Sequence, residues 1–182
     1  MVLRLTPSLN SANNDTGRTA YCGPTVLSAI TGYSVSRIEA LIHENRADAV
    51  AARGIIEGTT TGDVAEALAI FGFGMDKTDD FSGIERKRRP TVWSWMQHPR
   101  SVFSYYVLAV HKGRGGHWIS IKGAKICDTF TGGKWVDAAY GPNRGCRIIE
   151  VYQVKRVSEF APLGPLAERS AKSVSEACID PV

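Results

Sequence analysis

The sequence predicts an α+β protein in which a helical N-terminal half packs against a C-terminal antiparallel β-sheet. Apolar residues recur at helical spacing along the first part of the chain, whereas from Val102 onward they form short runs separated by glycine. A chain of 182 residues is long enough for one domain with a substantial core and too short for two domains of usual size. We therefore expect one domain over residues 1–160, helical over 1–100 and a sheet over 101–160, followed by a flexible tail over 161–182.

Composition argues against several classes of protein. The chain has 43% hydrophobic and 22% charged residues, unlike a disordered or a membrane protein, and no apolar run approaches the ~18 residues that span a bilayer. The N-terminus lacks the apolar core of a secretory signal, so we expect a cytoplasmic protein. The four cysteines form no Cys-x-x-Cys pair, which disfavours a metal site, and nothing suggests a cofactor. The net charge of +4 is too small to indicate nucleic acid as a partner, and the basic run at 85–89 is typical of a solvated surface.

Three helices are predicted in the N-terminal half. Each combines an apolar stripe at helical spacing with a start or stop residue such as serine, proline or glycine. Their expected bounds are Cys22 to Thr31, stopped by Gly32; from Ser34 or Ser36 to before Asn45; and from the connector 58–62 to Gly72 or Gly74.

Strands are predicted in the C-terminal half from apolar runs bounded by glycine and turn residues. The loops between them are short, which favours antiparallel pairing. A short helix or turn at 91–97 precedes the expected strands, which cover 105–110, 117–122, 125–130, a weaker segment around 134–136, and 147–157.

Cys22 stands where a loop enters the first helix. Gly23 and Pro24 follow it, and proline is tolerated in a first helical turn because its missing N–H would be unpaired there. Unpaired amides and the positive end of the helix dipole favour a thiolate at such a position. Most free cysteines are small buried hydrophobic residues, so this position alone makes Cys22 a candidate nucleophile and no more.

A hairpin in the second half brings a histidine and an aspartate together. A two-residue turn at Gly123–Ala124 would pair Lys122 with Lys125, and by the same register Ile119 would face Asp128. His117 then lies on the same face as Asp128, as its diagonal neighbour, within reach of an imidazole and a carboxylate.

These residue types form a complete set for nucleophilic catalysis. A thiol needs a base, an imidazole serves as one near neutral pH, and a carboxylate on the second ring nitrogen sets its tautomer and orientation. We therefore predict Cys22 as nucleophile, His117 as base and Asp128 as the residue that orients the base.

The order of these motifs resembles the papain-like cysteine peptidases, and most closely the bacterial and phage branch called peptidase C39-like. The matching residues are the Tyr21-Cys22-Gly23-Pro24 motif, the Gly116-His117-Trp118 motif and Asp128, within residues 14–155. The resemblance implies a papain-like fold with the site in a cleft between the helical half and the sheet half. It also implies attack of the Cys22 thiolate on a carbonyl and an acyl-enzyme intermediate.

One departure from the family concerns the oxyanion donor. The family has a glutamine a few residues before the cysteine, where this chain has Thr16, so Asn14 or Asn13 is our candidate amide donor beside the Cys22 N–H. The residues that adjoin the two motifs, Tyr21, Gly23, Gly116 and Trp118, are candidates for lining the substrate cleft, although the Trp118 side chain is expected on the opposite face from His117.

Three functions remain open at this point. The first is a cysteine hydrolase that cleaves a peptide or isopeptide bond of a peptide or protein substrate. The second is an acyltransferase, similar to transglutaminases, that uses the same three residues. The third is a catalytically weak relative that binds a protein partner as an effector or inhibitor, an alternative motivated by the missing glutamine.

Overall fold

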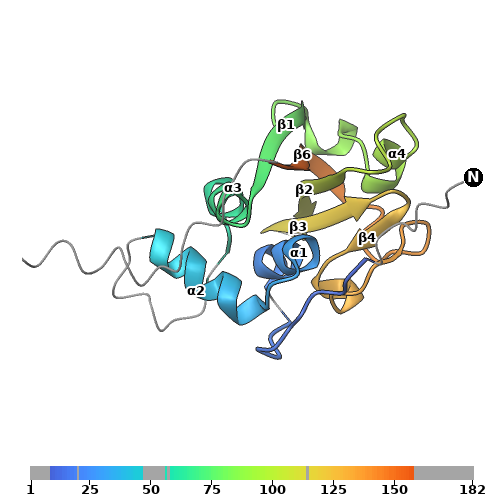
Figure 1. Cartoon of the computed structure of the whole chain (residues 1–182). Coiled ribbons are helices and arrows are strands. Elements are labelled where there is room, and N and C mark those ends of the chain that lie inside the picture. Colours follow the sequence, from blue (N-terminus) through green and yellow to red (C-terminus); the bar gives the residue numbers. More distant parts are fainter. Residues whose placement is uncertain (1–8, 20, 47–55, 57, 114, 158–182) are drawn as a thin grey trace, which may run out of the picture.

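The computed structural model describes residues 9–19, 21–46, 56, 58–113 and 115–157. It confirms the α+β class: helices α1 to α3 form one layer, and a six-stranded antiparallel sheet forms the other (Figure 1). Within this part of the chain, no helix is long and apolar enough to cross a membrane. The expected tail at 161–182 lies outside the described residues.

The helical layer follows the predicted bounds closely. Helix α1 spans Cys22–Thr31 and ends at Gly32, whose φ of 82° is the left-handed conformation that glycine adopts without strain. Helix α2 spans Val35–Asn45 and α3 spans Thr61–Ile70. The cap of α2 is Ser34, whose side chain accepts from the Arg37 N–H.

The strands appear in the order β1-β6-β2-β3-β4-β5 across the sheet, and every neighbouring pair is antiparallel. The predicted hairpin register is confirmed, since Lys122 pairs with Lys125 and Ile121 with Ile126. The bounds are Phe73–Asp80 (β1), Tyr105–Lys112 (β2), Gly115–Lys122 (β3), Lys125–Cys127 (β4), Val136–Asp137 (β5) and Arg147–Arg156 (β6).

Two elements differ from the sequence-based expectations. Strand β1 lies within the part expected to be helical, so the sheet is not confined to residues 101–160. As an edge strand, β1 pairs only with β6 and needs little apolar surface, which removes the usual sequence pattern. Strand β4 stops at Cys127 because the Asp128 side chain caps the short 3-10 helix η2 (Thr129–Thr131) instead of continuing the strand.

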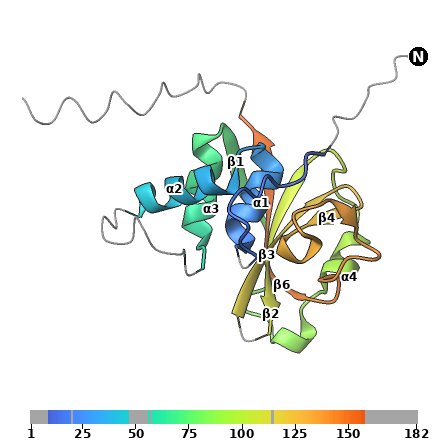
Figure 2. The ribbon, with the colours of Figure 1, turned by 90° about the horizontal axis from the view of Figure 1, so that it is seen from below.

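Each face of the sheet carries its own core. Helices α1 to α3 cover one face, and α4 (Val92–Met96) covers the other, as Figure 2 shows from below. Trp118 packs into the first core, whereas its neighbour Ile119 packs into the second. This alternation is the period-2 pattern of a strand that is buried on both faces.

Helix α1 packs closely against the Thr59 segment at its first turn. All residues from Gly23 to Ile30 are buried. A Cβ added at Gly23 would lie 2.4 Å from the Thr59 Oγ1, so no larger residue fits without displacing that segment. Gly23 therefore allows the N-terminal end of α1, with Cys22, to sit against its neighbours.

Candidate active site

Cys22 is the first residue of α1 and is half-buried against the core on the helical side of the sheet. Burial alone would raise the pKa of its thiol, but hydrogen bonding with the His117 side chain and with the backbone of Trp118 and Gly23 outweighs burial and lowers the pKa. The predicted imidazole therefore lies near enough to the predicted thiol to lower its pKa.

His117 is the third residue of β3 and is only 7% exposed. Its Nε2–H donates to the Asp128 Oδ2 at 3.0 Å, which leaves Nδ1 as the ring nitrogen available to Cys22. Burial lowers the pKa of His117, but the bonds to Asp128 and Cys22 outweigh it and raise the pKa to about 9. The imidazole is thus protonated when the thiol is ionised.

These two pKa shifts have opposite directions and a common cause. A thiolate stabilises a neighbouring imidazolium, and an imidazolium stabilises a thiolate, so the two shifts both favour the charged form of the pair. Such an ion pair holds a nucleophile and a proton donor side by side before any substrate arrives.

Asp128 is fully buried and uses both carboxylate oxygens. Its Oδ1 accepts the Thr131 N–H at 2.9 Å, while its Oδ2 accepts from His117 and from the Asn143 side-chain amide. Burial raises the pKa of Asp128, but the bonds from His117 and Asn143 outweigh burial and lower it. The carboxylate is therefore ionised and held in one orientation.

Three residues that the sequence reasoning did not assign to the site surround the His117–Asp128 pair. Asn143 is fully buried and donates to Asp128, and Lys112 donates to the other end of the Asn143 amide. The Phe130 ring lies 5.2 Å from the His117 ring in an edge-on arrangement. Phe130 follows Asp128 by two residues, but no local pattern connects Asn143, in a Gly-Pro-Asn turn, with the site.

The two candidate oxyanion donors lie on the N-terminal arm. The Asn13 N–H donates to the Ser28 Oγ at 2.8 Å, and its carbonyl accepts from Val35 at 2.9 Å, which ties the arm to α1 and α2. The Asn14 side-chain amide donates to the Arg18 carbonyl at 2.9 Å. Both side chains are exposed, and their role as oxyanion donors stays a prediction.

Two of the four cleft candidates are packing residues in the structure. Tyr21 is 4% exposed, and its hydroxyl bonds to Glu39 and to the Ile56 N–H. Trp118 is 6% exposed, and its indole N–H donates to the Thr59 carbonyl at 2.8 Å. Their large rings stabilise the junction of helices and sheet, as buried aromatic residues usually do.

The remaining two cleft candidates are glycines in different settings. Gly23 is buried at the start of α1, beside the sulfur of Cys22. Gly116 is exposed, and a Cβ added there would meet no atom within 4 Å. Gly116 therefore leaves the surface next to His117 open.

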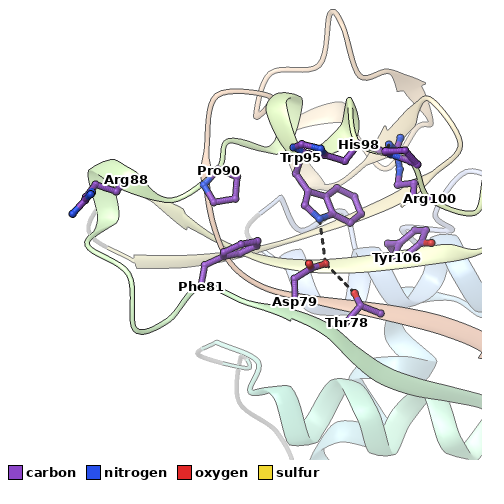
Figure 3. A pocket seen from close by; sticks show the side chains of 10 residues that line it. Thr78, Asp79, Phe81, Arg88, Pro90, Trp95, His98, Arg100 and Tyr106 are labelled. Atoms are coloured by element: carbon purple, nitrogen blue, oxygen red, sulfur yellow. Dashed lines mark hydrogen bonds between the residues drawn. The ribbon is translucent and has the colours of Figure 1, made fainter.

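A separate hollow lies on the α4 face of the sheet and contains none of the three predicted catalytic residues. It encloses about 620 Å³ beneath α4, with Trp95, Tyr106 and Asp79 on its walls (Figure 3). Two of its polar side chains are engaged: the Asp79 carboxylate accepts from the Trp95 indole, and the Arg100 guanidinium donates to the carbonyls of Met96 and Gly123. Cys22 lies on the other side of the sheet.

A second cysteine and a second histidine in or next to the sheet, Cys127 and His111, are less suited to catalysis. Cys127 is fully buried, and burial raises the pKa of its thiol to about 12. His111 bonds to the Arg89 guanidinium at 2.9 Å, and burial together with nearby arginines lowers its pKa. Within the described residues, no cluster of three or more His, Cys, Asp or Glu side chains could hold a metal ion.

Solved structures that resemble this chain include one peptidase domain. It is the peptidase domain of Streptococcus ComA, a bifunctional ABC transporter involved in a quorum-sensing pathway; the match has 15% identity and a TM-score of 0.47, and covers 81% of this chain and 100% of that domain. No protein-family model and no curated protein sequence matches the chain. We base the proposed function on the geometry around Cys22 and not on this resemblance.

Proposed function

We propose that this protein is a cysteine peptidase that cleaves a peptide or isopeptide bond through Cys22, His117 and Asp128. The observation that carries the proposal is one connected set of interactions. His117 lowers the pKa of the Cys22 thiol, His117 bonds to Asp128 at 3.0 Å, and the pKa values of thiol and imidazole move in opposite directions. This arrangement favours an ionised nucleophile beside a proton donor.

The first chemical step forms a thioester. The Cys22 thiolate adds to the carbonyl carbon of the substrate, and the C–N bond breaks as the imidazolium Nδ1–H of His117 donates its proton to the leaving nitrogen. The amine product departs, and the acyl group stays on Cys22. Asp128 keeps the His117 ring oriented throughout, because its bond to Nε2 is preserved.

The second step releases the acyl group. Neutral His117 takes a proton from a water molecule, and the water oxygen attacks the thioester carbonyl. The C–S bond breaks, the acid leaves, and the thiolate–imidazolium pair is restored. The Cys22 N–H, together with Asn14 or Asn13, is the proposed set of donors for the negative oxygen in both steps.

Mass spectrometry of an incubated peptide library tests the proposal. We expect new peptide termini with the wild-type protein, and a mass increase on the Cys22 peptide after rapid quenching. Cys22→Ala should abolish both signals, whereas Cys178→Ala, the same substitution at another cysteine, should keep them. If neither signal appears and Cys22 is alkylated no faster than a free cysteine near pH 7, the protein is not a cysteine peptidase.

The same experiment separates the alternatives. An added primary amine would be joined to the acyl group by an acyltransferase, and the amide product would then exceed the hydrolysis product. The binding alternative draws support from the Asn14 amide, which is engaged with the Arg18 carbonyl. It predicts no turnover and a partner that is still bound by Cys22→Ala.

A further inference from the structure

Two polar side chains behind Asp128 take no part in the chemical steps above. Asn143 is fully buried in the turn that precedes β6, and Lys112 is the last residue of β2. The Asn143 Nδ2 donates to the Asp128 Oδ2, and the Lys112 Nζ donates to the Asn143 Oδ1 at 2.5 Å. The amide thus links an ammonium group to the carboxylate of the site.

The chemistry of these partners allows one orientation of the Asn143 amide. A carboxylate accepts hydrogen bonds only, and an ammonium group donates only. Rotating the amide by half a turn would set its NH₂ group against the Lys112 ammonium and its oxygen against the Asp128 carboxylate. Both contacts would then be repulsive, with Asn143 and Asp128 fully buried. Lys112 and Asp128 together therefore fix which end of Asn143 faces Asp128.

Lys112 is also linked to His117, through the ring of Phe130. Its Nζ lies 4.4 Å from the centre of the Phe130 ring, and this ring in turn contacts the His117 ring at 5.2 Å. Phe130 is 56% exposed, and its ring contacts both the Lys112 ammonium and the His117 ring. A cation over its face holds the ring beside His117, where the ring covers the imidazole from solvent.

We propose that Lys112 is a positioning residue, which aligns Asp128 through Asn143 and His117 through Phe130 by two separate sets of contacts. This inference rests on the proposed function, because it concerns the same pair of catalytic groups. Its consequence is that the fraction of molecules with His117 aimed at Cys22 depends on a side chain that touches neither the sulfur nor the substrate.

A role through position and a role through charge predict different results. The Lys112 ammonium repels the nearby imidazolium, so a pure charge effect means that removing it raises the pKa of His117, favours the ion pair, and leaves alkylation of Cys22 near pH 6 unchanged or faster. A positioning role instead predicts that alkylation of Cys22 near pH 6 slows, because the thiolate there depends on an aligned imidazolium.

The test measures alkylation of Cys22 in the full chain with iodoacetamide, from about pH 5 to about pH 10, by mass spectrometry of the Cys22 peptide. We expect Lys112→Met to lower the rate near pH 6 at least about tenfold, as loss of an outer-shell partner commonly does, and to converge with the wild type near about pH 10, where any thiol is ionised. Lys112→Arg should recover most of the rate, because a guanidinium can donate to Asn143 and stack on Phe130.

Lys122→Met is the matched control. Lys122 lies 3.8 Å above the Tyr105 ring at the opposite end of β3, so the substitution removes the same kind of contact away from the site. It should leave the alkylation profile unchanged. Phe130→Leu tests the contact through Phe130 by itself. In that background the effect of Lys112→Met should be smaller than in the wild type, because only the contact through Asn143 is left to lose.

The outcomes separate this inference from the proposed function. If wild-type Cys22 reacts no faster than a free cysteine, the peptidase proposal fails and the role of Lys112 fails with it. If wild-type Cys22 is fast and Lys112→Met is equally fast or faster near pH 6, Lys112 does not position the pair and the peptidase proposal stands. Asn143→Ala is a weaker test, because a fully buried amide also supports folding.

Discussion

At the scale of single residues, Asp128 connects the catalytic pair with the rest of the fold. Its two oxygens accept bonds from His117, Asn143 and Thr131, which come from a strand, a turn and the 3-10 helix η2. A fully buried carboxylate is stable only when such donors compensate the loss of water. The same bonds that keep Asp128 charged therefore also orient His117.

Replacing Asp128 by asparagine should disable the site while keeping its shape. The amide is neutral and, with its NH₂ group towards His117, would favour the wrong tautomer of the ring. We expect peptide cleavage to fall by about 10²–10⁴-fold, the range seen when an orienting carboxylate is lost. Steady-state kinetics on a cleaved peptide from the library would measure this. An Asp137→Asn variant, changed at an exposed position, should retain full activity.

The coupled pKa values predict a bell-shaped pH dependence. Activity should rise as Cys22 ionises, at a pH below the ordinary thiol range, and fall as His117 loses its proton near pH 9. The raised pKa of His117 also sets how stability depends on pH: the contribution of His117 to the free energy of unfolding is fully present below the unfolded pKa of about 6.5 and is lost as the pH rises through about 9.

Carboxamidomethylation of Cys22 removes the thiolate, so the pKa of His117, followed by NMR, should fall. A His117 pKa unchanged by alkylation would contradict the ion pair.

At the scale of elements, the site depends on where α1 begins and where the β3–β4 hairpin ends. Helix α1 carries Cys22 at its first position, and the confirmed hairpin register carries Asp128 next to His117. The strand stops one residue before Asp128, so that the carboxylate can cap η2 and bond to His117 at the same time. Local hydrogen bonding of one side chain thus ends a strand and builds the site.

Close packing at the start of α1 gives a stability prediction. A Cβ at position 23 would lie 2.4 Å from the Thr59 Oγ1, so Gly23→Ala should destabilise the fold by about 1–3 kcal/mol, as over-packing commonly does. Urea denaturation followed by tryptophan fluorescence would measure the change. Gly62→Ala is the matched control, because its Cβ would meet nothing closer than 3.6 Å within helix α3. An unchanged midpoint for Gly23→Ala would show that the Thr59 segment moves away freely.

At the scale of the whole molecule, the site is assembled from parts that are remote in sequence. Cys22 comes from the helical layer, whereas His117, Asp128 and Asn143 come from the sheet and its loops. Contacts between these layers are formed only when both cores are packed. The low pKa of Cys22 is therefore a property of the folded state and should disappear with it.

Unfolding should change the reactivity of two cysteines in opposite directions. Near pH 6, a free thiol is almost fully protonated, so alkylation of Cys22 should slow on unfolding even as its exposure increases. Cys127 is fully buried, with a pKa raised to about 12, so its alkylation should accelerate. Both changes should occur at one urea concentration, as expected for a single cooperative unit. Separate midpoints would mean that the two layers unfold independently.

Features that arise from local spacing could be predicted from the sequence. The limits of α1, the pairing of Lys122 with Lys125 and the diagonal placement of His117 and Asp128 all follow from helical and strand periods. These features involve neighbours along the chain, where φ/ψ preferences and side-chain alternation act directly. The three predicted catalytic residues belong to this category.

Only the tertiary structure shows which distant groups complete the site. Edge strand β1 carries little apolar surface, and Asn143 and Lys112 occupy a turn and a strand end, where polar residues normally face water. Nothing local distinguishes an asparagine in a solvated turn from one that is fully buried against a carboxylate. That distinction arises when the turn before β6 packs beside Asp128. Burial removes water, so each buried polar group then depends on its hydrogen bonds within the protein.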